Sequence, residues 1–152
     1  MKNRRCFRSI LLLVLVAPTL AWAELGGNAA SLQTNQVRIK TNVMHTTTTS
    51  TNFSMQQNQT PNGVIIKQFI SNSGTVFAVT WQGPLMPNLK QLLGQYFDSY
   101  ITAAKNNQSG HSHLSIQQTD LVVQSSGHLR AFSGIAYIPS LMPAGVSVAQ
   151  LH

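Results

Sequence analysis

The stretch VIIKQFISNSGTVFAVTW, residues 64–81, decides the fold that we predict for this chain. Two runs of β-branched and aromatic residues, Val64–Ile70 and Thr75–Trp81, are joined by a short segment that ends in Gly74. This pattern is typical of an antiparallel hairpin, because glycine permits a tight turn between the strands. Successive side chains of a strand alternate between its faces. The face of the second run that we expect to meet the core carries Phe77, Val79 and Trp81.

An amphipathic helix is predicted directly after this hairpin. From Leu89 to Ala104, apolar residues recur at intervals of three and one, which lays one continuous apolar stripe along a helix. Asn88 is a candidate N-cap, and the polar residues 106–110 supply a stop signal. Because the stripe is wide and aromatic, we expect the helix to lie across a sheet.

A second hairpin is predicted after the helix. Asp120–Gln124 and His128–Ile138 have the composition of strands, and Ser125–Gly127 that of the turn between them. Pro139 and Pro143 interrupt the remainder of the chain, so the tail Leu141–Leu151 is expected to form an irregular strap over apolar surface. The order hairpin, helix, hairpin predicts an α+β fold. It would have a single antiparallel sheet of four to six strands and one amphipathic helix packed on one face.

The segment before the first hairpin is polar and weakly patterned. Residues 24–60 are expected to form a partly flexible N-terminal segment, ahead of an α+β core at residues 61–152. The first residues of this segment, Glu24–Gly27, are expected to be mobile. The run TTTTST at residues 46–51 fits either an exposed strand or a flexible segment.

The first residues of the chain predict export. Residues 1–8, MKNRRCFR, are basic, residues 9–20 form an apolar run, and residues 21–23 read Ala-Trp-Ala. This arrangement is typical of a cleavable signal peptide at residues 1–23. The apolar run is shorter than the roughly 20 residues that span a bilayer, which disfavours the alternative of an uncleaved anchor. We therefore expect a periplasmic or extracellular protein with no membrane span after cleavage.

Removal of a signal peptide would change the charge and the redox chemistry of the chain. Four of the ten basic residues would leave with it, so the formal net charge would fall from +7 to +3. The remaining bases are scattered and form no basic patch, which argues against a nucleic-acid partner. The single cysteine, Cys6, would also be removed, so the mature chain would have no disulfide and no thiolate ligand.

Few side chains of the mature chain could support hydrolysis. Its three acids, Glu24, Asp98 and Asp120, are a poor basis for a mechanism that needs paired carboxylates. His128 and Ser133 lie in the same predicted hairpin as Asp120 and leave a Ser–His–Asp arrangement open. However, no Gly-x-Ser-x-Gly elbow occurs in the sequence. We therefore predict no catalytic residue.

The histidines offer one spacing that resembles a metal site. His111 and His113 are separated by one residue, and two such imidazoles can bind one Zn²⁺ or Cu²⁺ ion. A site usually needs a further protein ligand, which His128 or His45 could supply only if the fold brought it close. The sequence therefore predicts neither a metal nor a cofactor, and His111 and His113 are the candidates if a metal site exists.

Several stretches of the chain together resemble a known family. They are ELGGNAAS (24–31), GTVFAVTWQGP (74–84) running into LKQLLGQYF (89–97), and GHLRAFSGIAY (127–137) with LMPAGV (141–146). This combination resembles a family of small exported proteins of Gram-negative bacteria, domain of unknown function number 2844. The resemblance implies a leader peptide, and it implies no known activity, cofactor or catalytic residue.

The sequence favours a non-enzymatic periplasmic protein that binds or accompanies an envelope component, either a protein or a polymer. Aromatic and basic groups beside predicted turns are the candidates for a ligand surface: Trp81, His128 and Arg130. Arg130 is otherwise expected to pair with Asp120 across the second hairpin.

Two other classes of function remain open. One is a small hydrolase or metal-binding protein using His111, His113 and His128 with Asp120 or Ser133. The other is a structural subunit of an envelope assembly, which would recruit further strands at an open sheet edge.

Overall fold

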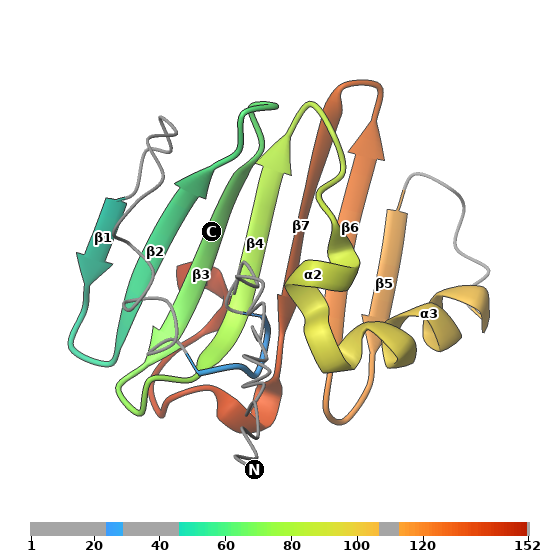
Figure 1. The fold of residues 1–152 in the computed structure, drawn as a ribbon. Helices are drawn as coiled ribbons and strands as arrows, with labels where there is room; N and C mark the ends of the chain where they lie inside the picture. The colour runs from blue at the N-terminus through green and yellow to red at the C-terminus, as the bar shows by residue number, and fades with distance from the viewer. Residues whose placement is uncertain (1–23, 29–45, 107–112, 152) are drawn as a thin grey trace, which may run out of the picture.

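The described part of the protein is one antiparallel sheet with a layer on each face. The structure, a computed structural model, describes residues 24–28, 46–106 and 113–151. Within these residues the sheet has seven strands in the order β1-β2-β3-β4-β7-β6-β5 (Figure 1). The strands are β1 (Thr46–Thr49), β2 (Phe53–Gln59), β3 (Ile65–Ser71), β4 (Val76–Gly83), β5 (His113–Gln117), β6 (Val122–His128) and β7 (Ala131–Tyr137).

The predicted α+β class with four to six strands is wrong, because the described chain is mostly β and its sheet has seven strands. Strand β1 corresponds to the exposed strand that was one of the two alternatives for the threonine run, whereas β2 and β5 were not predicted. Strand β2 reads FSMQQNQ, and the face that starts with Phe53 and Met55 continues with Gln57 and Gln59. One face therefore changes from apolar to polar along the strand. A strict alternation of apolar and polar residues, on which strand prediction depends, is absent.

The turn predicted at Ser125–Gly127 is also wrong. Strand β6 continues through these residues to His128, and the turn consists of Leu129 and Arg130. Ser126 pairs with Ser133 across this ladder, and their hydroxyls hydrogen bond to each other at 3.1 Å. Arg130 has a φ of 61°, in the left-handed region that few residues other than glycine adopt.

One helical segment crosses the sheet on the face formed by β7, β6 and β5 (Figure 1). It consists of α2 (Leu89–Leu93), the 3₁₀ turn η1 (Gly94–Tyr96) and α3 (Phe97–Asn106). The side chain of Asn88 accepts a hydrogen bond from the Gln91 amide at 3.2 Å and caps the segment. The predicted single helix is interrupted at Gly94, which has a φ of 52° and packs against the Glu24 side chain. None of the helices in the described ranges has the length and hydrophobicity to cross a membrane.

A β-bulge changes which residues of β4 face the helices. Ile70 pairs with Val76, whereas Phe69 pairs with Ala78, so Phe77 is an extra residue in β4. Val79 and Trp81 pack with the helical segment, but Phe77 packs in the cluster on the opposite face. The prediction that Phe77 shares their face is therefore wrong. It assumed that side chains alternate strictly between the two faces of the strand, and an inserted residue breaks this alternation.

The C-terminal tail covers part of the opposite face. It includes the 3₁₀ turns η2 (Pro139–Leu141) and η3 (Val148–Leu151). Leu151 is fully buried against Phe69 and Phe77, and Phe53 lies edge-on to both rings. Among the described residues, the tail thus covers the apolar part of this face.

The start of the described chain is part of the core. Leu25 is fully buried, and its amide donates to the carbonyl of Leu92 at 2.9 Å. The amide of Gly26 donates to Val76, and Asn28 forms a bridge with Thr75. The prediction that Glu24–Gly27 is mobile is therefore wrong. The predicted signal peptide, residues 1–23, lies outside the described residues.

The indole of Trp81 packs directly against the backbone at Gly134 on the neighbouring strand β7. A Cβ at residue 134 would lie 2.6 Å from Cε2 of Trp81 and 2.8 Å from the carbonyl oxygen of Gln124. Gly134→Ala is therefore expected to cost about 1–3 kcal/mol of unfolding free energy, measured by urea denaturation, because neither the ring nor the backbone can move freely. Ser133→Ala, one residue earlier on the open face, is the control and should cost less than Gly134→Ala. Equal stability of the two variants would contradict this account.

Candidate functional site

The strand register arranges the face opposite the helices in rows that run across the sheet. One row is apolar and contains Met55, Phe69, Ala78, Tyr137 and Val122. All of these except Val122 belong to the cluster that includes Leu151 of the C-terminal tail. The next row is mostly polar and contains Gln57, Lys67, Thr80, Ile135, Gln124 and Ser115. The row beyond it contains Gln59, Ile65, Gln82, Ser133, Ser126 and His113. The same face is therefore apolar where the tail covers it and polar where it is open.

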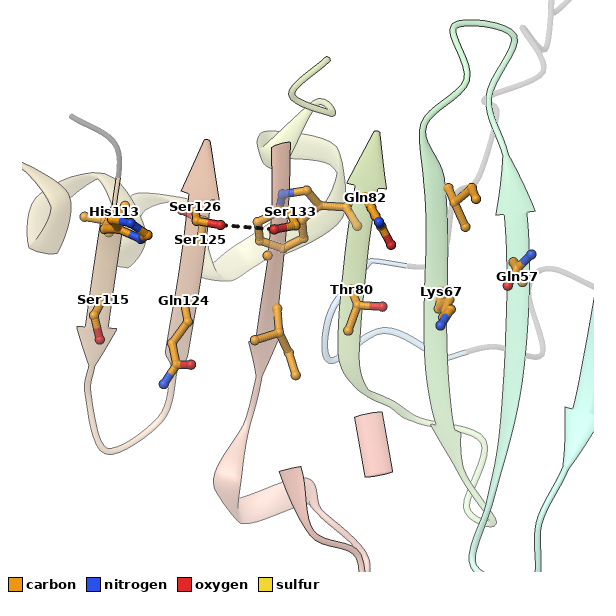
Figure 2. A pocket seen from close by; sticks show the side chains of 15 residues that line it. Gln57, Lys67, Thr80, Gln82, His113, Ser115, Gln124, Ser125, Ser126 and Ser133 are labelled. Atoms are coloured by element: carbon orange, nitrogen blue, oxygen red, sulfur yellow. Dashed lines mark hydrogen bonds between the residues drawn. The ribbon is translucent and has the colours of Figure 1, made fainter. Parts of the chain in front are cut away.

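The two polar rows line a shallow groove with a volume of about 740 Å³. Figure 2 shows side chains from β2, β3, β4, β7, β6 and β5 standing along this face, with amide and hydroxyl groups at their ends. The hydrogen bond between Ser126 and Ser133 joins two neighbouring strands at the centre of the groove (Figure 2). Ile65 adds apolar surface between the polar groups, whereas Ile135 is buried at the border with the apolar cluster under the tail.

The groove offers hydrogen bonds and very little charge. Lys67 is the one lysine or arginine among its lining residues, and no carboxylate lines it. The acids Glu24, Asp98 and Asp120 belong to the N-terminal segment, to α3 and to the β5–β6 turn. Burial raises the pKa of Tyr100, but this residue packs with the helices on the other face. The arrangement suits recognition of a polar ligand better than acid–base chemistry on it.

Trp81, one of the predicted surface residues, does not offer an exposed aromatic ring. It is only 2% exposed, and it packs with the helical segment. Its Nε1 is buried and has no hydrogen-bond partner among the described residues. A ligand surface built on this ring is therefore ruled out by its burial.

His128 and Arg130 are exposed at the β6–β7 turn. Asp120 precedes β6 and Arg130 follows it, so the two residues lie at opposite ends of a seven-residue strand. The expected pairing of Arg130 with Asp120 is therefore wrong. Leu129 is 95% exposed beside Arg130, which makes this turn the most prominent apolar tip in the described chain.

The Ser–His–Asp arrangement does not form. Asp120 is separated from His128 by the length of β6, and Ser133 is bonded to Ser126. A nucleophile needs its base, and the base its orienting carboxylate, within hydrogen-bond reach. The geometry therefore gives no support to a hydrolase that uses these residues.

Two of the histidines lie close together. The rings of His113 on β5 and His128 on β6 have centroids 6.1 Å apart at an interplanar angle of 84°. His111 and His45 lie outside the described residues. In the part of the chain that is described, no group of three or more His, Cys, Asp or Glu side chains converges as a metal site would require.

The prediction from sequence missed most of the groove. Of its central residues, Lys67, Thr80 and Gln124 were assigned to strands but not to a site. Gln82 was expected to follow the strand that ends at Trp81, whereas it belongs to β4. A signal was present in β3, where Lys67 stands between the apolar residues Val64–Ile66 and the apolar pair Phe69 and Ile70. A lysine inside such a strand indicates that part of one face meets solvent.

The fold and groove define a class of protein: a single antiparallel sheet with a helical segment over part of one face, and with a C-terminal tail and an open polar surface on the other. A family model matches residues 21–151 under the description Protein of unknown function (DUF2844). The chain belongs to this family, as the resemblance in its sequence indicated. No curated protein and no solved structure matches the chain. The family has no assigned function, so the function has to be argued from the groove.

Proposed function

We propose that the protein is a non-enzymatic, exported binding protein, and that its groove binds a glycan of the cell envelope. The observation that carries the proposal is the pair of polar rows on the open half of the sheet, with Lys67 as their single lysine or arginine. Serine, threonine and glutamine side chains both donate and accept hydrogen bonds, which matches the hydroxyl and amide groups of a sugar polymer.

The shape of the groove supports an extended ligand. It is open along the sheet and crosses six neighbouring strands. Strands lie about 4.8 Å apart, so each polar row is roughly 24 Å long. Sites for drug-sized molecules are enclosed and mostly apolar, whereas this surface is shallow and polar. An extended chain of hydroxylated units fits such a surface along its length.

The start of the chain supports an envelope location. The basic, apolar and small-residue segments at residues 1–23 are typical of a signal peptide. An exported protein would meet its ligand outside the cytoplasm, and glycans are abundant there. The proposal of export and the proposal of glycan binding can be tested separately, the first by sequencing the N-terminus of the exported protein.

The alternative of a structural subunit has less support. Such a subunit would add strands at an open edge, and β1 is an edge strand of four exposed threonines. Short, polar edge strands are a common protection against this kind of pairing. The other edge strand, β5, has α3 packed near it.

Binding can be tested by co-sedimentation of the purified protein with peptidoglycan sacculi, together with competition by delipidated envelope polysaccharides. Gln82 and Gln124 are exposed in the groove. The double variant Gln82→Ala/Gln124→Ala should weaken binding about tenfold or more, because each hydrogen bond contributes about 0.5–1.5 kcal/mol.

The matched control is Gln91→Ala/Gln118→Ala, which removes two exposed amides outside the groove. It should bind as the unmodified protein does. If both double variants weaken binding equally, or if no glycan probe is bound at all, the proposal is wrong.

A further inference from the structure

We propose that His113 and His128 form a surface site for a divalent transition-metal ion, with Cu²⁺ as the strongest binder. The two residues come from neighbouring antiparallel strands. His113 lies opposite Ser126, and His128 is two residues further along β6, so both imidazoles project from the same face of the sheet. This inference is independent of glycan binding.

The separation of the rings fits a shared metal ion. A metal–nitrogen bond of about 2.0–2.1 Å places an imidazole centroid about 3.2 Å from the ion. Two imidazoles on one ion then have centroids about 4.5 Å apart for adjacent ligands of a tetragonal ion, about 5.2 Å apart for tetrahedral geometry and about 6.4 Å apart for opposed ligands. The observed 6.1 Å lies inside this range.

The environment leaves both rings free to adjust. The 84° angle between their planes means that one ring has to rotate before both nitrogens can face the same ion. Both side chains are exposed, so this rotation meets little resistance from packing. The site lies at the end of the polar row that contains Ser126 and Ser133, so the remaining coordination positions face water and hydroxyl groups.

The number of protein ligands favours copper over zinc. Structural zinc sites take four protein ligands and catalytic zinc sites three, and no such group exists among the described residues. Cu²⁺ accepts tetragonal nitrogen and oxygen ligands, and it exceeds Ni²⁺ and Zn²⁺ in the usual order of affinities. Two imidazoles completed by water satisfy this preference.

The test is a titration of the purified protein with Cu²⁺, followed by calorimetry and by pulsed EPR that counts coordinated imidazoles. One ion should bind per chain with two imidazole nitrogens. His113→Ala and His128→Ala should each reduce the count to one and lower the affinity about tenfold or more, because two linked ligands act at high effective concentration. Thermal melting of each variant checks that the fold is retained.

The controls are His152→Ala and His111→Ala, which should leave both the affinity and the nitrogen count unchanged. The proposal is overturned if His113→Ala and His128→Ala bind Cu²⁺ as the unmodified protein does. It is also overturned if His111→Ala abolishes binding while either of the other two variants retains it. The same titration with Zn²⁺ should give weaker binding, and tighter zinc binding would contradict the assignment of the metal.

Discussion

Trp81→Ala is expected to lower the free energy of unfolding by about 3–5 kcal/mol, which is a large part of the stability of a domain of this size. The indole is 2% exposed and packs between the helical segment and the backbone at Gly134. Truncation removes the apolar contacts and leaves a cavity that the ladder of β4 and β7 cannot close. Urea denaturation monitored by far-UV circular dichroism measures the loss.

Trp81→Phe separates packing from the buried polar group. The buried Nε1 has no acceptor among the described residues and is itself a cost, because a buried donor without an acceptor loses about 1–3 kcal/mol relative to water. Phenylalanine removes this donor while it keeps most of the apolar contact, so its cost should be much smaller than that of alanine. Gln82→Ala, on the exposed side of the same strand, is the control and should be nearly neutral. A stable Trp81→Ala protein would show that the ring is not a core residue.

This result also decides how binding experiments are interpreted. A sequence-based choice of Trp81 as a ligand residue would attribute any loss of binding to a lost contact. Because the ring is buried, loss of binding in Trp81→Ala would result from unfolding. Exposed groove residues such as Gln82 and Gln124 are therefore the informative positions.

The parts of the fold that could be predicted are those with strong local patterns. The hairpin at residues 64–81 corresponds to β3 and β4, and the stripe from Leu89 to Ala104 corresponds to the helical segment. In both, apolar residues recur at the period of the element and the ends carry turn or cap residues. Asn88 is such a cap, and the structure confirms it.

The parts that could not be predicted depend on contacts between distant residues. Ser125–Gly127 has turn composition, yet it pairs along β7 because that strand extends past it. The bulge at Phe77 is a matter of register between β3 and β4, which local sequence does not encode. Tertiary pairing prevails over local propensity at both positions.

The groove was missed for a related reason. Its residues are single polar positions in separate strands, and only the register of six strands brings them into two rows. The residues chosen from sequence were those with distinctive side chains beside turns, of which His128 and Arg130 are exposed and Trp81 is buried. Ordinary glutamines and serines carry no such signal until their strands are aligned.

Leu25→Ala is expected to lower the free energy of unfolding by about 2–5 kcal/mol, although the residue is only two positions beyond the predicted cleavage point. Its side chain is fully buried in the cluster that joins the helical segment to the sheet. Its amide bonds to Leu92, and the neighbouring Gly26 and Gly27 exchange hydrogen bonds with Val76. The loss of the leucine side chain therefore weakens the attachment of a whole segment and leaves a cavity beneath α2.

Leu129→Ala is the matched control, because it removes the same atoms from a side chain that is 95% exposed. Its unfolding free energy should stay within about 0.5 kcal/mol of the unmodified protein.

A chain that begins at Asn28 should behave like Leu25→Ala or worse, since it lacks both the buried leucine and the bonds to Leu92 and Val76. If Leu25→Ala and Leu129→Ala unfold at the same urea concentration, the N-terminal segment does not contribute to the core. If the leucine is required, cleavage after Ala23 retains it, whereas cleavage a few residues later would release a protein without part of its core.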